Sequence, residues 1–246
     1  MKNSIILCEG STDYVLLQYY MRKVNSWNDS LNQKGVIKFT KQKSRLLSKG
    51  ENELTIAAMG GCSKLDVSLK QVFERNFNSS PLQQEVYHNI VIILDHDDSC
   101  VGSNVVKSVL NIFDEYDVKY SQVDCNKWND FTMHNRIGVS ISFKLLIMLI
   151  PFTQEGAMET FLLEAISDKD DYDAKIIKSA NNFVENIDEE RHYLNSRRNI
   201  VKAKFDVYFS IRTSAEQFNE RQNILKNIPW EDYPKIQEDF YLLSEI

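Results

Sequence analysis

Short apolar runs alternate with amphipathic segments along the first half of the chain. Each run has the length and β-branched content of a buried strand, and most are followed by a Ser and by apolar positions at helical spacing. The predicted strands cover 4–8, 54–59, 90–94 and 118–123, and the predicted helices begin near Ser11, Ser63 and Ser103. Strands that alternate with helices imply right-handed crossovers and a parallel sheet.

A second pattern begins near residue 138. An apolar, β-rich segment runs to Pro151, and Ser140, Ser142 and Lys144 interrupt it, which favours core strands over a membrane span. Helical spacing follows at 156–166, 173–186, 194–211 and 215–227, and a final apolar cluster at 230–243 is expected to pack on the core. We therefore predict an α/β fold, with a mostly parallel sheet and helices on both faces over residues 1–150, and a helical C-terminal region over 151–246.

Composition places the chain among globular proteins and bears on its compartment. Of its 246 residues, 43% are hydrophobic and 26% charged, as in typical globular domains. The four cysteines are widely spaced, which favours reduced thiols over disulfides or a zinc site. The apolar N-terminal run is too short for a signal peptide, so we expect a cytoplasmic protein without membrane segments.

Charge is distributed unevenly along the chain. The net charge is −6, but residues 1–150 carry about +1 and the remainder about −7. The polar stretch 26–53, interpreted as a basic insertion with one possible strand at 36–39, has six bases and no acid between residues 31 and 50. Lys38, Lys41, Lys43 and Arg45 are therefore candidates to contact nucleic-acid phosphates, although such a run is also typical of a solvated loop.

The strand predicted at 90–94 ends in three acids, Asp95, Asp97 and Asp98. Asp95 and Asp97 are two residues apart, so in extended chain they point the same way. Two converging carboxylates repel each other unless a cation lies between them or one holds a proton, and Mg²⁺ suits such a set. An Asp-rich turn that merely ends a strand is the alternative.

Two more acids follow the first strand. Glu9 comes directly after it, and Asp13 lies in the first turn of the next helix. The carboxyl ends of parallel strands meet at one edge of a sheet, so Glu9 and Asp13 are expected near Asp95 and Asp97. Either acid could instead serve only a helix dipole.

These motifs together resemble the toprim domain. The strand ending in Glu9-Gly10, the later strand ending in Asp95-His-Asp97 and the glycine pair Gly60-Gly61 between them are most similar to its OLD-like nuclease branch. The segment Gly156-Ala-Met-Glu159 is similar to a helix start that this branch places after the toprim core. The resemblance implies Glu159 and Glu155 as further metal candidates, and Lys202 and Lys204 as basic residues near the site. Asp98, at the acidic strand end, is a weaker metal candidate. Glu159 could instead serve only a helix dipole, and the two lysines a solvated helix face.

The expected function is a nuclease that cleaves phosphodiester bonds in DNA or RNA, including tRNA, with one or two Mg²⁺ or Mn²⁺ ions. Glu9, Asp95 and Asp97 are the expected catalytic residues. The chain has no Gly-x-x-x-x-Gly-Lys-[Ser/Thr] motif. It thus resembles stand-alone toprim subunits, such as the toxin of the PARIS anti-phage defence system, which implies a separate ATPase partner.

Two other readings compete with the nuclease. An Asp-x-Asp motif also marks haloacid dehalogenase-like phosphatases, but there it lies on the first strand, whereas here it ends the third predicted strand and Asp98-Ser99 follows it. A toprim-like module without catalytic activity is the other alternative. The joint presence of Glu9, Asp95 and Asp97 argues against it. The oligomeric state is left open.

Overall fold

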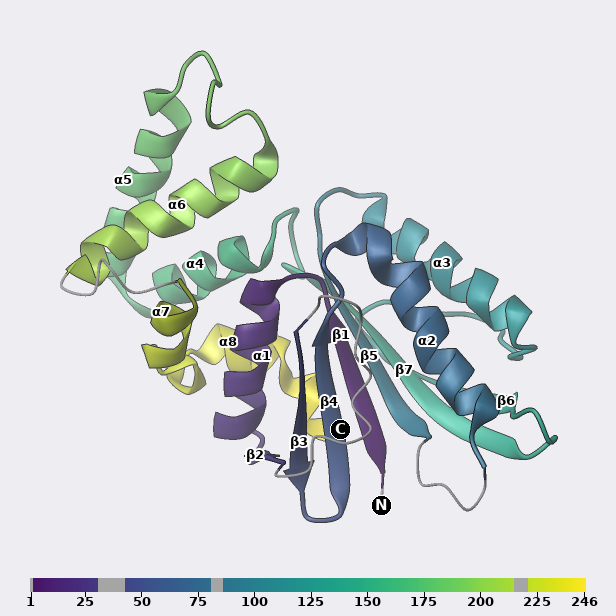
Figure 1. Cartoon of the computed structure of the whole chain (residues 1–246). Coiled ribbons are helices and arrows are strands. Elements are labelled where there is room, and N and C mark those ends of the chain that lie inside the picture. Colours follow the sequence, from purple (N-terminus) through teal and green to yellow (C-terminus); the bar gives the residue numbers. More distant parts are fainter. Residues whose placement is uncertain (1, 31–42, 81–85, 215–220) are drawn as a thin grey trace.

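A computed structural model describes residues 2–30, 43–80, 86–214 and 221–246. Its core is a seven-stranded sheet (Figure 1). The strands are β1 (Asn3–Cys8), β2 (Asn28–Asp29), β3 (Ser44–Lys49), β4 (Asn52–Ala58), β5 (Tyr87–Asp95), β6 (Trp128–His134) and β7 (Ser140–Ile150). The α-helices are α1 (Ser11–Lys23), α2 (Leu65–Asn78), α3 (Val101–Glu115), α4 (Met158–Lys169), α5 (Asp171–Ile187), α6 (Arg197–Arg212), α7 (Arg221–Asn227) and α8 (Pro234–Asp239). Short 3-10 turns lie at Cys62–Lys64, Trp230–Asp232 and Tyr241–Glu245.

The strand order is β2-β3-β4-β1-β5-β7-β6. Strands β4, β1, β5 and β7 run parallel, and β3 and β6 pair antiparallel to β4 and β7. The predicted α/β class with a mostly parallel sheet is thus confirmed. In the register of the central strands, Cys8 lies opposite Ala58 on one side and Ile93 on the other. The carboxyl ends of β4, β1 and β5 therefore lie together at one edge.

The prediction of a strand at 118–123 is wrong. Val118 and Val123 are buried against the α2 and α3 side of the sheet, but the chain between them forms no ladder. The place beside β5 belongs to β7, which β6 flanks. The apolar spacing of this loop reflects side-chain burial without backbone pairing, which a sequence pattern cannot distinguish from a strand.

The stretch interpreted as a basic insertion contributes to the sheet. Strands β2 and β3 extend its edge beyond β4, with Ser44 opposite Ala57. The possible strand at 36–39 lies outside the described residues, as do residues 215–220 of the last predicted helix. The third helix predicted after Pro151 begins at Arg197 rather than 194, because Ser196 caps it by accepting the Asn199 N–H at 3.3 Å.

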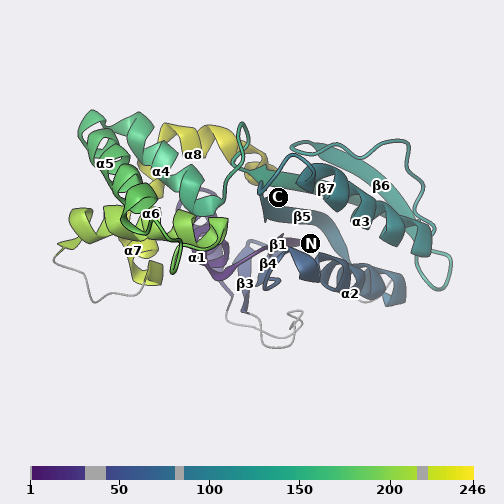
Figure 2. The same ribbon diagram turned by 90° about the horizontal axis from the view of Figure 1, so that it is seen from above.

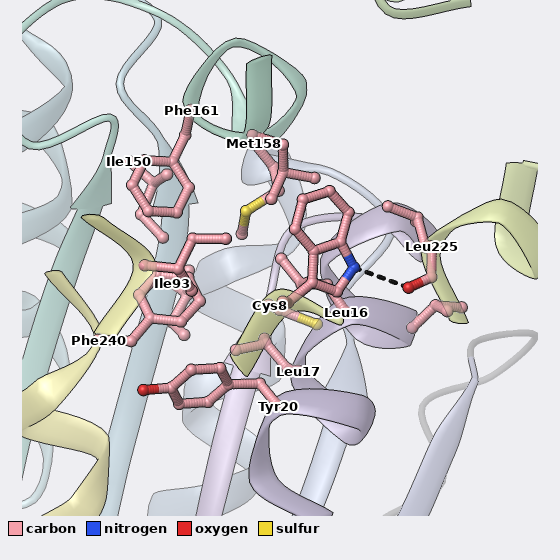
Figure 3. Packing of buried hydrophobic residues seen from close by; sticks show 14 of the residues in the cluster. Cys8, Leu16, Leu17, Tyr20, Ile93, Ile150, Met158, Phe161, Leu225 and Phe240 are labelled. Atoms are coloured by element: carbon pink, nitrogen blue, oxygen red, sulfur yellow. Dashed lines mark hydrogen bonds between the residues drawn. The ribbon is translucent and has the colours of Figure 1, made fainter. Parts of the chain in front are cut away.

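Helices cover the sheet on both faces (Figures 1 and 2). Helices α2 and α3 pack on one face, and α1, α4 and the C-terminal segments pack on the other. The Phe161 and Phe240 rings stack with their centroids 5.3 Å apart, and the indole N–H of Trp230 donates to the Leu225 carbonyl at 2.7 Å (Figure 3). The region after Pro151 thus shares a core with β1 and β5.

Candidate active site

Glu9 and Asp95 meet at the carboxyl edge of the sheet. Glu9 directly follows β1, and Asp95 is the last residue of β5, the parallel neighbour of β1. The Asp95 backbone N–H donates to Glu9 Oε2 at 3.3 Å. Parallel pairing therefore delivers both acids to one point, as their positions after buried runs predict.

The glycine pair that follows β4 encloses the Glu9 backbone. The N–H groups of Gly60 and Gly61 both donate to the Glu9 carbonyl oxygen at 3.0 Å. Gly60 has φ +87° and Gly61 φ +118°, a region that L side chains rarely adopt. Glycine at these positions lets the chain turn back over the end of β1.

Two helices add the acids Asp13 and Glu159, whose exposed fractions are 5% and 4%. Asp13, in the first turn of α1, accepts the Gly10 N–H at 2.7 Å. Glu159, in the first turn of α4, accepts the Thr12 hydroxyl at 3.2 Å. Asp95 Oδ1 accepts the Met158 N–H at 3.0 Å, which fixes the start of α4 to the end of β5. The Thr12–Glu159 hydrogen bond then links the start of α1 to that of α4.

His96 connects β5 to the segment that leads into α4. Its N–H donates to the Ile150 carbonyl at 2.8 Å, and its own carbonyl accepts the Gly156 N–H at 2.8 Å. A Cβ at Gly156 would lie 2.8 Å from the Pro151 ring, so glycine is required for this close approach. His96 Nδ1 lies 3.1 Å from the Pro151 carbonyl oxygen, away from the carboxylates that it separates in sequence.

The acids line a cavity of about 290 Å³, here called the edge cavity. Helix α6 forms another part of its wall, with Arg197, Arg198 and Lys202. Arg197 Nη1 is 3.7 Å from Asp97 Oδ1. The full lining is Glu9, Gly10, Ser11, Thr12, Asp13, Gly60, Gly61, Asp95, Asp97, Ala157, Glu159, Arg197, Arg198, Val201 and Lys202. The N-termini of α1, α4 and α6 thus converge on the cavity, and helix N-termini favour anions.

Burial and mutual repulsion shift the pKa values of these carboxyls. Burial raises the pKa of Glu9; the N–H of Asp95 opposes this, and the charge of Asp97 adds to it. Burial and the charges of Glu159 and Glu9 raise the pKa of Asp13 to about 7. Burial, then the charges of Asp13, Glu9 and Glu159, raise the pKa of Asp95 well above its usual value. Without a cation, the cluster therefore retains protons that isolated carboxyls would lose.

Two of the predicted acids lie outside the edge cavity. Asp98 accepts the Cys100 N–H at 2.7 Å next to the start of α3 and does not line the cavity. Glu155 is exposed and lines a neighbouring cavity instead. The structure thus brings together Glu9, Asp13, Asp95, Asp97 and Glu159, and not Asp98 or Glu155.

The predicted basic residues also separate by position. Lys202 lines the edge cavity, whereas Lys204 pairs with Glu185 on α5. Lys43 and Arg45 do not line the cavity, and Arg45 Nε is 2.8 Å from Asp29 Oδ1. Lys38 and Lys41 lie outside the described residues.

Arg197 and Arg198 were not predicted as site residues. Arg198, Val201 and Lys202 are three and four residues apart, so they share one helix face. That spacing could have marked a basic face, but it could not show that the face meets the carboxylates of β1 and β5.

Within the described ranges, no three His, Cys, Asp or Glu side chains are arranged to hold one metal ion. Four of the five cavity acids instead accept hydrogen bonds, from Asp95, Gly10, Met158 and Thr12. The metal therefore stays a prediction, and coordination would require these side chains to rotate toward one another.

None of the helices in the described part of the chain is long and apolar enough to cross a membrane.

Fold and site define an α/β protein with a carboxylate-lined cavity at the carboxyl edge of its parallel strands. Residues 3–238 match the family described as Protein of unknown function (DUF3226), and the chain belongs to this family. No curated protein matches it.

A solved structure shares the overall fold of this chain at low identity. The hypothetical protein PH0156 from Pyrococcus horikoshii OT3 is 13% identical, with a TM-score of 0.50 over 99% of this chain and 100% of that one. At this identity the likeness shows the fold alone. A lactoylglutathione lyase from Agrobacterium tumefaciens is 10% identical over 59% of this chain and 92% of that one. Its TM-score of 0.17 is too low to indicate a shared fold.

Proposed function

We propose that this protein is a metal-dependent nuclease that hydrolyses phosphodiester bonds in nucleic acid. One observation carries the proposal: five carboxylates from β1, α1, β5 with its following loop, and α4 share a cavity with Arg197, Arg198 and Lys202 of α6. A carboxylate cluster attracts cations, while guanidinium groups and helix N-termini attract phosphate. A cavity that can hold a cation on its carboxylates and a phosphate on its basic side and helix N-termini suits an anionic, phosphate-containing substrate.

Mg²⁺ or Mn²⁺ fits the chemistry of this donor set. The candidate ligands, Glu9, Asp13, Asp95, Asp97 and Glu159, offer only carboxylate oxygens, which hard divalent cations prefer. The repulsion that raises the pKa values of Asp13 and Asp95 would be relieved by a bound cation. When bound, such an ion would polarise a phosphoryl oxygen and lower the pKa of water.

The protein's own residues would bind and orient the substrate. Arg198 and Lys202 would contact phosphate oxygens. Arg197 would exchange its ion pair with Asp97 for one with the phosphate, because the Arg197–Asp97 pair is 3.7 Å long and partly exposed to solvent. Where the other carboxylates hold the ion, Glu9 would instead carry the proton, since burial raises its pKa and its carboxylate lines the cavity.

A substrate panel tests this proposal. The full chain is incubated with duplex DNA, single-stranded DNA, tRNA and other RNA, each with Mg²⁺, Mn²⁺ or chelator. We expect cleavage of at least one polymer with a metal and none with chelator, and Glu9→Gln should abolish it. A wild-type chain that cleaves none of the polymers, or that cleaves equally in chelator, would refute the proposal. A phosphate monoester in the same panel tests the phosphatase alternative.

We extend the proposal to biological role: the nuclease acts as a toxin in antiviral defence, ending in abortive infection, and an ATPase partner controls it. The toprim resemblance and the acidic C-terminal region support this. Tyr172, Phe183 and Ile187 on α5 expose 72%, 53% and 61% of their surface, as in protein-binding patches. Co-purification with the product of any ATPase gene that neighbours its own is expected; purification without any ATPase would contradict this role.

A further inference from the structure

A second cavity lies among α4, α5 and α6, and it is here called the helical cavity. Its volume is about 480 Å³, within the range of small-molecule sites. Leu163, Ile177 and Ile200 give it an apolar surface. Polar groups from all three helices complete the lining, so the cavity combines apolar contacts with hydrogen-bonding positions.

Two acceptors in the wall of the helical cavity lack hydrogen-bond donors. Glu164 Oε1 on α4 and Asn181 Oδ1 on α5 are buried, and no donor within the described ranges reaches either. A buried acceptor without a partner costs about 1–3 kcal/mol, so a ligand that supplies N–H groups would be favoured there. The lining therefore favours a ligand that carries N–H donors over one that carries only acceptors.

Charge disfavours an anion in the helical cavity. Three acids line it, Glu155, Glu164 and Asp168, against two bases, Arg197 and Lys204. Lys204 is already paired with Glu185, and Arg197 lies 3.7 Å from Asp97. A phosphate would meet more negative than free positive charge. A neutral, planar ligand with amino groups suits the lining better.

The helical cavity adjoins the edge cavity. Arg197 and Val201 of α6 line both, so the two cavities are neighbours along this helix. A nucleotide has this layout, because its anionic phosphate and its neutral base are held at a fixed short distance. With the phosphate at Arg197 and Arg198, the base can reach the helical cavity.

We propose that the helical cavity binds the nucleobase next to the cleaved phosphate and prefers bases with an exocyclic amino group over uracil or thymine. Adenine, cytosine and guanine each carry an exocyclic amino group, whereas the exocyclic polar groups of uracil and thymine are carbonyl oxygens alone. The inference rests on the proposed nuclease function. It adds sequence preference to that function.

The test compares Asn181→Ala with Asn182→Ala. Asn182 is the adjacent, exposed residue of α5 and does not line the cavity, so it is a matched control. Oligonucleotides randomised around the cleavage position are digested by the full chain and the products are sequenced. We expect the wild type and Asn182→Ala to favour amino-bearing bases at one flanking position by about tenfold, and Asn181→Ala to lose that preference while still cleaving.

A binding measurement separates this inference from the nuclease proposal. Titration of the full wild-type chain with AMP, GMP, CMP and UMP should give weaker binding for UMP, and Asn181→Ala should bind UMP and the best of the other three alike. Cleavage without any base preference, or a preference that Asn181→Ala retains, overturns the subsite and leaves the nuclease standing. If no polymer is cleaved, the nuclease proposal fails, and equal or absent binding of the four nucleotides then overturns the subsite as well.

Discussion

Asp13→Asn should change how the stability of the protein depends on pH. Asp13 is buried, its pKa in the folded protein is raised to about 7, and an unfolded chain would titrate it at 3.8. The folded state therefore binds the proton more tightly. This contribution to stability is complete below pH 4 and is lost as pH rises through 7. The carboxyls that face Asp13 come from three other elements: Glu9 after β1, Asp95 on β5 and Glu159 on α4.

The size of the effect follows from the shift. At pH 5, two units below the folded-state pKa of about 7, the bound proton stabilises the fold by about 3 kcal/mol, and at pH 8.5 by almost nothing. Asn has no proton to lose, and its amide oxygen can still accept the Gly10 N–H. Between pH 5 and pH 8.5, the free energy of unfolding of the wild type should thus fall by roughly 2–3 kcal/mol more than that of Asp13→Asn.

Urea unfolding of both chains with chelator, at half-unit steps from pH 5 to 8.5, measures this difference. Asp66→Asn is the control, because Asp66 is an exposed acid in the first turn of α2. It should follow the wild-type profile. Parallel profiles for wild type and Asp13→Asn would refute the claim that burial and neighbouring carboxylates keep Asp13 protonated.

Three further substitutions test packing, backbone and charge. Gly61→Ala, at φ +118°, should destabilise the fold by roughly 1–3 kcal/mol in urea unfolding; an unchanged midpoint would contradict the required conformation. Trp230→Phe should lower the free energy of unfolding by about 2 kcal/mol, because the buried Leu225 carbonyl loses its hydrogen-bond donor. Equal stability of the two proteins would count against this contact. Arg198→Ala should weaken nucleic-acid binding and lower the slope of log Kd against log salt by about one, whereas Arg45→Ala should not, because Arg45 pairs with Asp29 and does not line the edge cavity. The same slope for both variants would contradict the role of α6.

The sequence pattern predicted the acidic edge because that edge follows from local rules. Buried β-branched runs predict parallel strands, and parallel strands place the residues after them together. Glu9 and Asp95 therefore meet through one hydrogen bond although 86 positions separate them. Asp98, two residues before the Cys100 N–H that it binds, shows the limit of this reasoning. Whether an acid faces a site or caps a turn depends on the next bend of the chain.

Tertiary packing determines the two features that the sequence pattern did not predict correctly: the loop at 118–123 and the position of the α6 arginines. The loop at 118–123 has the apolar spacing of a strand, yet β7 occupies the neighbouring position in the sheet. Arg197 and Arg198 begin an ordinary capped helix, and only the packing of α6 against α4 and α5 brings them to the carboxylates. No local period encodes that contact between distant segments.

Cleavage by Asp95→Asn compared with Asp98→Asn tests the central claim most directly. The two aspartates are three residues apart, but only Asp95 lines the edge cavity. With Mg²⁺ and the polymer that wild type cleaves, Asp98→Asn should retain activity within about threefold, and Asp95→Asn should lose at least about a hundredfold, as expected when a metal ligand is removed. Full activity in folded Asp95→Asn would contradict a carboxylate-dependent nuclease site at this edge of the sheet.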